Sequence, residues 1–520
     1  MMKKSNVIKH VLLFILLFII LLLFLSTIWA LNTFAFINFD EILFQLTSPI
    51  KSTESSILIS FALTSFLPTI IISIITYLFI KELYKYYKYD KLNFKIKLFN
   101  KKVNFNIKTT IIKTITTILI ILICLLIIFF SLYKLTFINY IKSQMENSKF
   151  IEENYIDPDN VKIKFPEKKR NLIYIYAESL ESTYFSKDVG GESNYNYIAP
   201  LTNTTMDNIN FSDTNTIGGA IGVPGTTWTT GAMVAHSAGI PLKINPDITN
   251  DYRVSGMLDG TTTLGDILEK EGYNQMLMIG SDKAFGNRGL YFKKHGNFKV
   301  YDYYTAIKKG KIPEDYYVWW GYEDSKLFEY AKEEVTKLSK KDKPFNFTML
   351  TANTHTEDGY IESSCTANSG NHYLDSVSCS SEQIESFIEW IKNQDFYDNT
   401  TVILVGDHIS MQPDLYPSDT KRRIYNVFIN SAKKTTNNKN RMFTTMDLFP
   451  TTLSSLGVEI EGDKLGLGTD LFSNKKTLIE EIGEYDFNIE ISKRSDFYLN
   501  NLLYNKKSTK LKWTPNSSQK

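Results

Sequence analysis

The residues best suited to chemistry in this sequence stand at the ends of short apolar runs. Asp407 and His408 follow the run 401–405 after one glycine, and Glu178 follows the run 172–176. Two carboxylates and an imidazole can bind one divalent cation, which would lower the pKa of a coordinated hydroxyl and neutralise phosphate oxygens. By itself the Asp-His pair could equally be a helix cap beside a surface histidine, so the accompanying residues decide its interpretation.

A hydroxyl for such a cation to activate lies in the segment 222–235, which reads Gly-Val-Pro-Gly-Thr-Thr-Trp-Thr-Thr before small and apolar residues. Proline and glycine favour a turn, and the residues that follow favour a packed helix. The N–H groups and dipole at a helix N-terminus attract phosphate. Thr226 or Thr227 is therefore a candidate nucleophile, and we select Thr226. Taken alone, either threonine could be an ordinary helix cap.

Three further residues are candidates for binding a substrate. Arg288 lies in the segment Phe-Gly-Asn-Arg-Gly, and the guanidinium fork matches phosphate oxygens. His355 follows the apolar run 345–350, and Asp282 follows the run 276–279. We expect Asp282 to orient Arg288 or to bind a hydroxyl. A surface arginine and a structural histidine are the plain alternatives.

The four apolar runs that precede these residues have the length of buried strands. Apolar residues at helical spacing lie between them, at 263–271, 382–393 and 447–456. Strands that alternate with helices indicate an α/β fold with a mostly parallel sheet covered by helices. Ligands of such sheets bind beyond the carboxyl ends of the strands, so the candidate residues should converge on one site.

Three other apolar runs, at about 10–31, 57–80 and 111–133, are nearly uncharged and long enough to cross a bilayer as helices. The first is too long for a signal peptide, lacks a clear cleavage site and is followed by two more spans. The organisation we predict is a membrane domain, an interfacial helix with a linker, a catalytic domain and a C-terminal extension, at 1–133, 134–169, 170–472 and 473–520. Apolar residues from Ile479 to Leu503 should pack on the catalytic domain, with only the last residues loose.

Charge and cysteine use orient the chain. The loop 81–108 is rich in lysine, whereas 32–56 has one lysine and three acids, so the positive-inside rule places everything after residue 133 outside the cytoplasm. A nucleic-acid patch would not be expected between two membrane spans. Cys365 and Cys379 are the only cysteines of the exported part, and a disulfide suits an oxidising compartment better than a zinc site, which needs paired spacings.

These motifs resemble a known superfamily. The Thr-Thr-Trp-Thr, Met-Val-Ala and Gly-Ile-Pro-Leu segments within 226–242 resemble the nucleophile region of the periplasmic glucan phosphoglycerol transferases. Gly-Asp-His at 406–408 and the runs 447–453 and 466–472 are similar to motifs of the sulfatase and alkaline-phosphatase superfamily. The resemblance covers about 170–472 and the layout of N-terminal membrane helices. It indicates the branch that also contains the lipoteichoic acid synthases.

The resemblance implies a sulfatase-like exported domain and a two-step transfer. A threonine, matching Thr226, attacks phosphatidylglycerol and releases diacylglycerol, and a hydroxyl of an envelope glycan then takes the phosphoglycerol group. Arg288 and His355 match positions that hold the glycerol phosphate. The resemblance also implies one divalent ion, commonly Mn²⁺ with Mg²⁺ or Zn²⁺ as alternatives, at the positions Glu178, Thr226, Asp407 and His408.

The sequence departs from the family pattern in one place. Lipoteichoic acid synthases carry a tryptophan before the Asn-Arg pair, where this chain has Gly286. The loop between the two exported cysteines is more like that of the periplasmic transferases, and the Cys/Ser-x-Pro-x-Arg signature of a true sulfatase is absent at the nucleophile.

The sequence therefore predicts a phosphoglycerol transferase of the bacterial cytoplasmic membrane, with its catalytic domain on the periplasmic side and no nucleic-acid partner. Three alternatives remain: a phosphoethanolamine transferase acting on lipid A or another glycan, a phosphodiester hydrolase, and a non-catalytic envelope protein that binds glycans. Metal binding by the folded protein would separate the last from the others.

Overall fold

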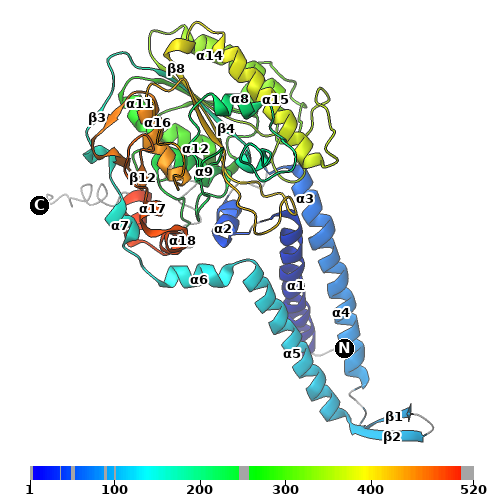
Figure 1. Ribbon diagram of the computed structural model, residues 1–520. Coiled ribbons are helices and arrows are strands. Elements are labelled where there is room, and N and C mark those ends of the chain that lie inside the picture. The colour runs from blue at the N-terminus through cyan, green and yellow to red at the C-terminus, as the bar shows by residue number, and fades with distance from the viewer. Residues whose placement is uncertain are drawn as a thin grey trace, which may run out of the picture. The chain divides into compact units, whose positions relative to one another are not determined.

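The computed structural model describes residues 4–35, 37–47, 53–86, 89, 91–98, 101–244 and 257–504. The chain forms two compact units, Met1–Phe39 with Glu54–Tyr140, and Asp40–Thr53 with Ile141–Lys520. We describe each unit by itself. Figure 1 labels the elements along the chain.

The first unit is built on three apolar helical segments, which confirms the three predicted spans. Stretches long and apolar enough to cross a membrane are Ile8–Thr33, Ser55–Leu83 and Thr109–Lys134. They correspond to α1 (Lys4–Thr33), to α3 (Ser55–Phe61) continued by a π-turn into α4 (Leu67–Tyr86), and to α5 (Thr109–Lys134). Strands β1 (Lys91–Leu98) and β2 (Lys101–Lys108) form an antiparallel pair between the second and third segments.

Polar side chains join the first two helical segments of this unit. The hydroxyls of Ser26 and Ser65 lie 3.1 Å apart. The indole N–H of Trp29 donates to the Ser60 hydroxyl at 3.1 Å. Such bonds hold apolar helices together where burial alone gives little preference between lipid and protein.

A six-stranded sheet organises the second unit, in the order β6-β5-β7-β4-β8-β9. All neighbours are parallel except β8 and β9. The strands are β4 (Asn171–Ala177), β5 (Asn274–Ile279), β6 (Lys299–Tyr301), β7 (Phe345–Leu350), β8 (Thr400–Gly406) and β9 (Asn426–Ile429). The four predicted strands are the four central ones, because strands buried on both faces are the ones that read as continuous apolar runs.

Helices cover both faces of the sheet, as predicted. Along β4, Leu172, Tyr174 and Tyr176 enter one buried apolar cluster, whereas Ile173, Ile175 and Ala177 enter the other. The first cluster packs against α9 (Thr229–Ala238), α11 (Leu264–Lys270), α12 (Arg288–Lys294) and α16 (Leu448–Ser455). The second packs against α8 (Leu201–Met206), α13 (Tyr303–Lys308), α14 (Asp324–Ser339) and α15 (His372–Lys392).

The C-terminal extension packs on this unit, as predicted for Ile479 to Leu503. Phe487, Ile491 and Tyr498 are buried in the first apolar cluster. The predicted loose C-terminal end lies outside the described residues after 504. The remaining elements are α2 (Phe39–Thr47), α6 (Phe137–Met145), α7 (Phe150–Asn154), β3 (Ile163–Lys164), β10 (Glu459–Ile460), β11 (Lys464–Leu465), β12 (Gly468–Thr469), α17 (Leu478–Ile482) and α18 (Glu484–Ser492).

Candidate active site

Two neighbouring strands bring the predicted metal ligands together. β4 and β8 are paired in register, with Ala177 opposite Gly406. The next residues are Glu178 on one strand and Asp407 on the other, so their carboxylates meet beyond the same edge of the sheet. One ligand atom each from Glu178, Asp407 and His408 lies within 4.8 Å of the others, and all three residues are buried.

Hydrogen bonds hold the two carboxylates in place. Ser179, in the left-handed region at φ 55°, donates its backbone N–H to Asp407 Oδ1 at 2.8 Å. The backbone N–H of His408 donates to the same oxygen at 2.9 Å. The Ser179 hydroxyl donates to Glu178 Oε1, also at 2.8 Å. Oδ2 of Asp407 is buried and accepts no hydrogen bond within the described part of the chain. A buried carboxylate oxygen without a donor is the arrangement expected of a cation ligand.

The charges of the cluster favour the same interpretation. Burial, followed by the negative charge of Glu178, raises the pKa of Asp407 to about 7. Burial lowers the pKa of His408, but the two carboxylates together outweigh it and raise that pKa to about 9. Nδ1 of His408 contacts the Ile409 carbonyl at 2.8 Å, and a carbonyl can only accept. Nδ1 therefore carries a proton, and Nε2, 3.3 Å from Asp407 Oδ2, is the atom available for a metal.

A threonine completes the cluster, but it is not the predicted one. The Oγ1 atom of Thr229 lies 3.5 Å from Glu178 Oε2 and 3.5 Å from His408 Nε2. The Oγ1 atom of Thr226 instead donates to the Val223 carbonyl at 2.9 Å and accepts from the Val223 N–H at 3.1 Å. The structure thus brings Thr229 to the metal-type residues and uses Thr226 to close the preceding turn, which corrects the sequence-based selection.

The reason is where the helix begins. Trp228 is extended, with φ −136° and ψ 158°, so α9 starts at Thr229 and not directly after the glycine turn. A residue at the first position of a helix lies beside its free N–H groups and the positive end of its dipole. The run Thr-Thr-Trp-Thr-Thr gives no sign of this offset, because every threonine in it is an acceptable cap or helix starter.

Arg288 approaches the cluster from a sharp turn. Gly286 and Asn287 both have left-handed φ, 59° and 56°, immediately before α12. The Arg288 side chain is buried and donates to the Phe285 carbonyl, to the Ser281 hydroxyl and to the Asp282 carbonyl. Burial lowers the pKa of Arg288 to about 10, opposed by the charges of Glu178, Asp282 and Asp407. The guanidinium is therefore charged and within the electrostatic reach of the cluster.

Gly286 explains the departure from the lipoteichoic acid synthase pattern. A Cβ at this position would lie 2.5 Å from the Thr230 hydroxyl, which donates to the Gly286 carbonyl at 2.9 Å. The left-handed backbone and this close approach both favour glycine. The turn that carries Arg288 is thereby bonded to the first turn of α9, beside Thr229.

His355 lies within electrostatic reach of the cluster, whereas the Asp282 carboxylate is hydrogen-bonded within its own loop. Burial lowers the pKa of His355 to about 4, with His408, Asp407 and Arg288 contributing charges nearby, so its imidazole is neutral at pH 7. Its ring packs on Trp320 at a centroid distance of 4.3 Å. The Asp282 carboxylate accepts from the Ala284 N–H at 2.8 Å, and it is the backbone carbonyl of Asp282 that contacts Arg288.

A family model described as Sulfatase matches residues 170–458. The chain belongs to the sulfatase family. The matched region contains the metal-type cluster, Thr229, Arg288 and His355. The chain is also a membrane protein, since three of its helical segments are long and apolar enough to cross a bilayer.

Curated relatives of this sulfatase-family chain carry the name phosphoglycerol transferase I. The protein of Escherichia fergusonii is 31% identical over 320 residues, which are 60% of this chain and 40% of that protein. The protein of Escherichia coli strain 536 is 31% identical over 319 residues, with the same coverage. The chain thus spans about 40% of the length of these relatives.

A solved structure is similar in fold over most of the chain. Lipooligosaccharide phosphoethanolamine transferase A from Neisseria meningitidis, an integral membrane protein, is similar over 94% of this chain and 90% of its own, with a TM-score of 0.52 and 13% sequence identity. The similarity confirms the predicted α/β architecture with N-terminal helices.

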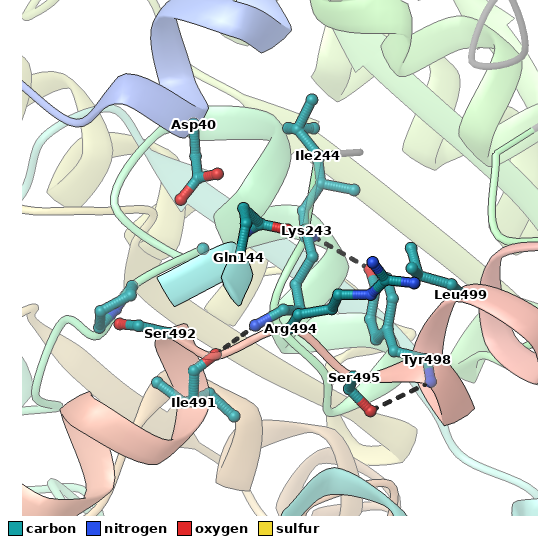
Figure 2. A pocket seen from close by; sticks show the side chains of 13 residues that line it. Asp40, Gln144, Lys243, Ile244, Ile491, Ser492, Arg494, Ser495, Tyr498 and Leu499 are labelled. Carbon is teal, nitrogen blue, oxygen red and sulfur yellow. Dashed lines mark hydrogen bonds between the residues drawn. The ribbon is translucent and has the colours of Figure 1, made fainter. Parts of the chain in front are cut away.

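Two further features complete this part of the sulfatase-family domain. Cys365 and Cys379 form the predicted disulfide, which ties the loop after β7 to α15. A small hollow, open to solvent, lies behind the threonine turn and is lined by Pro224, Gly225 and Lys243 among others. In Figure 2 the Asp40 carboxylate points into this hollow.

Proposed function

We propose that this protein is a metal-dependent phosphoglycerol transferase in which Thr229 is the nucleophile. The observation that carries the proposal is the position of the Thr229 hydroxyl, 3.5 Å from both a carboxylate and an imidazole of the buried cluster. The 31% identity to proteins named phosphoglycerol transferase I supports the choice of transferred group.

Glu178, Asp407 and His408 would hold the metal ion, and Thr229 would face it. A bound divalent cation would act as a Lewis acid, lowering the pKa of the threonine hydroxyl and neutralising phosphate oxygens. We favour Mn²⁺, with Mg²⁺ or Zn²⁺ as alternatives. The unsatisfied Oδ2 of Asp407 and Nε2 of His408, which would give up its proton on binding the ion, are the atoms that suit it.

The remaining residues perform the transfer. Thr229 Oγ1 gives up its proton and attacks phosphorus, the bond from phosphorus to the diacylglycerol oxygen breaks, and that oxygen takes up one proton in exchange as diacylglycerol leaves. The N–H groups of the first turn of α9 and the Arg288 guanidinium are placed to hold the phosphate oxygens. An acceptor hydroxyl then attacks the phosphothreonine, loses its proton and returns the threonine to its hydroxyl form.

His355 is suited to proton handling in these steps. Its Nδ1 contacts the Thr356 carbonyl at 2.7 Å, so Nδ1 carries the proton and Nε2 the lone pair. The lowered pKa, about 4, keeps the ring neutral at pH 7. A neutral imidazole with a free Nε2 can accept a hydrogen bond or a proton from a substrate hydroxyl.

We propose phosphatidylglycerol as the donor and an envelope glycan as the acceptor, with the catalytic unit on the periplasmic side of the bacterial cytoplasmic membrane. The lysine-rich segment 81–108 and the disulfide between Cys365 and Cys379 support this orientation. Attachment to the bilayer raises the effective concentration of a lipid head group at the site.

The test uses the full chain reconstituted with Mn²⁺ in vesicles of phosphatidylglycerol or of phosphatidylethanolamine, and follows diacylglycerol release. We expect release from phosphatidylglycerol, and none from a Thr229→Val variant. Release only from phosphatidylethanolamine would indicate phosphoethanolamine transfer. Release of free glycerol phosphate at the same rate with and without a glycan would indicate a hydrolase, and a folded chain that binds no divalent ion would indicate a non-catalytic protein.

A further inference from the structure

Two adjacent tryptophans, Trp319 and Trp320, meet different surroundings. The indole N–H of Trp319 donates to the Ala352 carbonyl at 3.1 Å. Trp320 is only 5% exposed, and its indole nitrogen is buried with no acceptor in the part of the chain that the structure describes. Because an indole nitrogen can only donate, burying it unpaired is costly. The Trp320 N–H therefore needs an acceptor from a water molecule or from a ligand.

The Trp320 ring contacts both of the segments that carry the candidate substrate-binding residues. Its centroid lies 4.9 Å from that of Phe285 and 4.3 Å from that of the His355 imidazole. The centroid of the Phe285 ring in turn lies 5.2 Å from the guanidinium carbon of Arg288. The indole thus packs on the imidazole and is separated from the guanidinium by a single ring.

Hydrogen bonds tie these two segments to the candidate active site. The Gly286 carbonyl accepts from the Thr230 hydroxyl at 2.9 Å, which joins the arginine turn to the first turn of α9. The Thr354 hydroxyl donates to the Glu178 carbonyl at 2.5 Å, which joins the other segment to a metal-type residue. The two rings that contact Trp320 belong to the residues next to Gly286 and Thr354. These contacts place Trp320 in the wall of the candidate active site.

The chemistry of the ligand follows from the groups that this wall offers. His355 is half-buried, so the wall meets solvent at the imidazole. Its Nδ1 donates to the Thr356 carbonyl at 2.7 Å, which leaves Nε2 as an acceptor. An indole donor beside an imidazole acceptor matches a hydroxyl, which accepts one hydrogen bond and donates another. An ammonium group has only donors and an alkyl group has neither, so both would leave the indole unpaired.

We propose that Trp320 is a specificity-determining residue that donates its indole N–H to a glycerol hydroxyl of the phosphoglycerol group. The phosphate faces Arg288 and the metal-type cluster, and the glycerol faces Trp320 and His355. The head group is then selected by its ability to accept a hydrogen bond. This proposal rests on the proposed function, since it takes phosphoglycerol as the transferred group.

The test measures binding to the full chain in detergent with Mn²⁺ by calorimetry. The probes are glycerol phosphate, ethanolamine phosphate and propyl phosphate, which has the same carbon chain as glycerol phosphate but no free hydroxyl. Trp320→Phe keeps an aromatic ring and removes the donor. It should bind glycerol phosphate about 3- to 10-fold less tightly than the parent, the range for one neutral hydrogen bond. Its affinities for the other two probes should equal those of the parent.

Trp319→Phe is the matched control, because it removes the neighbouring indole N–H, whose acceptor is the Ala352 carbonyl. It should lower thermal stability and leave the ratio of the glycerol phosphate and propyl phosphate affinities as it is in the parent. Equal weakening of all three probes by Trp320→Phe would overturn the proposal, since Trp320 would then only support the wall. An unchanged affinity for glycerol phosphate would overturn it as well, since water would then serve the indole.

A measurement on the parent decides the question even if Trp320→Phe does not fold. In protein labelled with ¹⁵N-tryptophan, one indole N–H resonance should shift with glycerol phosphate and not with propyl phosphate. This resonance should persist in Trp228→Phe and in Trp319→Phe. Absence of such a resonance, or its loss in either variant, would contradict the assignment to Trp320. Failure of the proposed function is seen separately, as no diacylglycerol release from phosphatidylglycerol by the parent protein.

Discussion

The sharpest prediction concerns two threonines that lie three residues apart. We consider the isosteric pair Thr226→Val and Thr229→Val, each of which removes a hydroxyl and keeps the side-chain shape. Thr226 is fully buried, and its hydroxyl forms bonds of 2.9 and 3.1 Å with the Val223 carbonyl and N–H. Thr229 forms contacts of 3.5 Å with the cluster and none shorter in the described structure.

The two variants should therefore fail in opposite ways. Thr226→Val leaves the buried N–H of Val223 without its acceptor, which should cost about 1–3 kcal/mol of unfolding free energy. Its activity should stay within a few-fold of the parent, because the turn before α9 is otherwise intact. Thr229→Val should change the unfolding free energy by less than about 0.5 kcal/mol. It should lower the rate of diacylglycerol release at least about 10³-fold, as expected for the loss of a nucleophile.

The assay pairs diacylglycerol release from phosphatidylglycerol vesicles with thermal unfolding of the same preparations. In addition, rapid quenching without an acceptor, followed by peptide mass spectrometry, should find phosphoglycerol on the peptide that contains Thr229, at that residue. Thr229→Ser should keep measurable activity. An active Thr229→Val variant, or a modified Thr226, would refute the reasoning from the helix start.

Three further predictions follow from separate contacts. Gly286→Ala should lose about 1–3 kcal/mol of stability and most of the activity, because a Cβ would lie 2.5 Å from a hydroxyl on α9 in a left-handed turn; calorimetry and the release assay check this. His236 is buried and its pKa is lowered by burial to about 3. Below pH 6.5 the unfolded chain binds a proton that the folded chain does not, so stability is lost as pH falls. Between pH 6.5 and pH 4.5 the unfolding free energy of His236→Gln should therefore fall by roughly 1–3 kcal/mol less than that of the parent. Denaturant titrations at the two pH values measure this difference. Non-reducing peptide mapping should recover Cys365 and Cys379 in one cross-linked peptide and Cys124 as the free thiol, and two free thiols in the exported part would contradict the assignment.

The edges of the sheet show one limit of pattern reading. β6 has three residues and β9 four, and neither has the length of the central apolar runs. Their pairing is decided by the neighbouring strands β5 and β8, so no local pattern predicts them. His236 hydrogen-bonds Tyr174, and His295 is buried between Asp266 and the Met257 carbonyl, contacts that no local pattern around either histidine predicts.

The candidate site shows a second limit. Glu178, Asp407 and His408 could be predicted because they stand within two residues of a strand end, and parallel strands end at the same edge of a sheet. The choice between Thr226 and Thr229 could not, since it depends on whether Trp228 is extended or helical.

The sequence alone determined the apolar spans, the buried central strands and the residues that end them, because these depend on composition and on short-range periodicity. The tertiary structure decided which threonine meets the metal-type cluster. The choice depends on contacts between segments far apart in the chain, α9 against the ends of β4 and β8. Local patterns carry no information about such contacts, because the free energy that selects them arises only when the segments pack together.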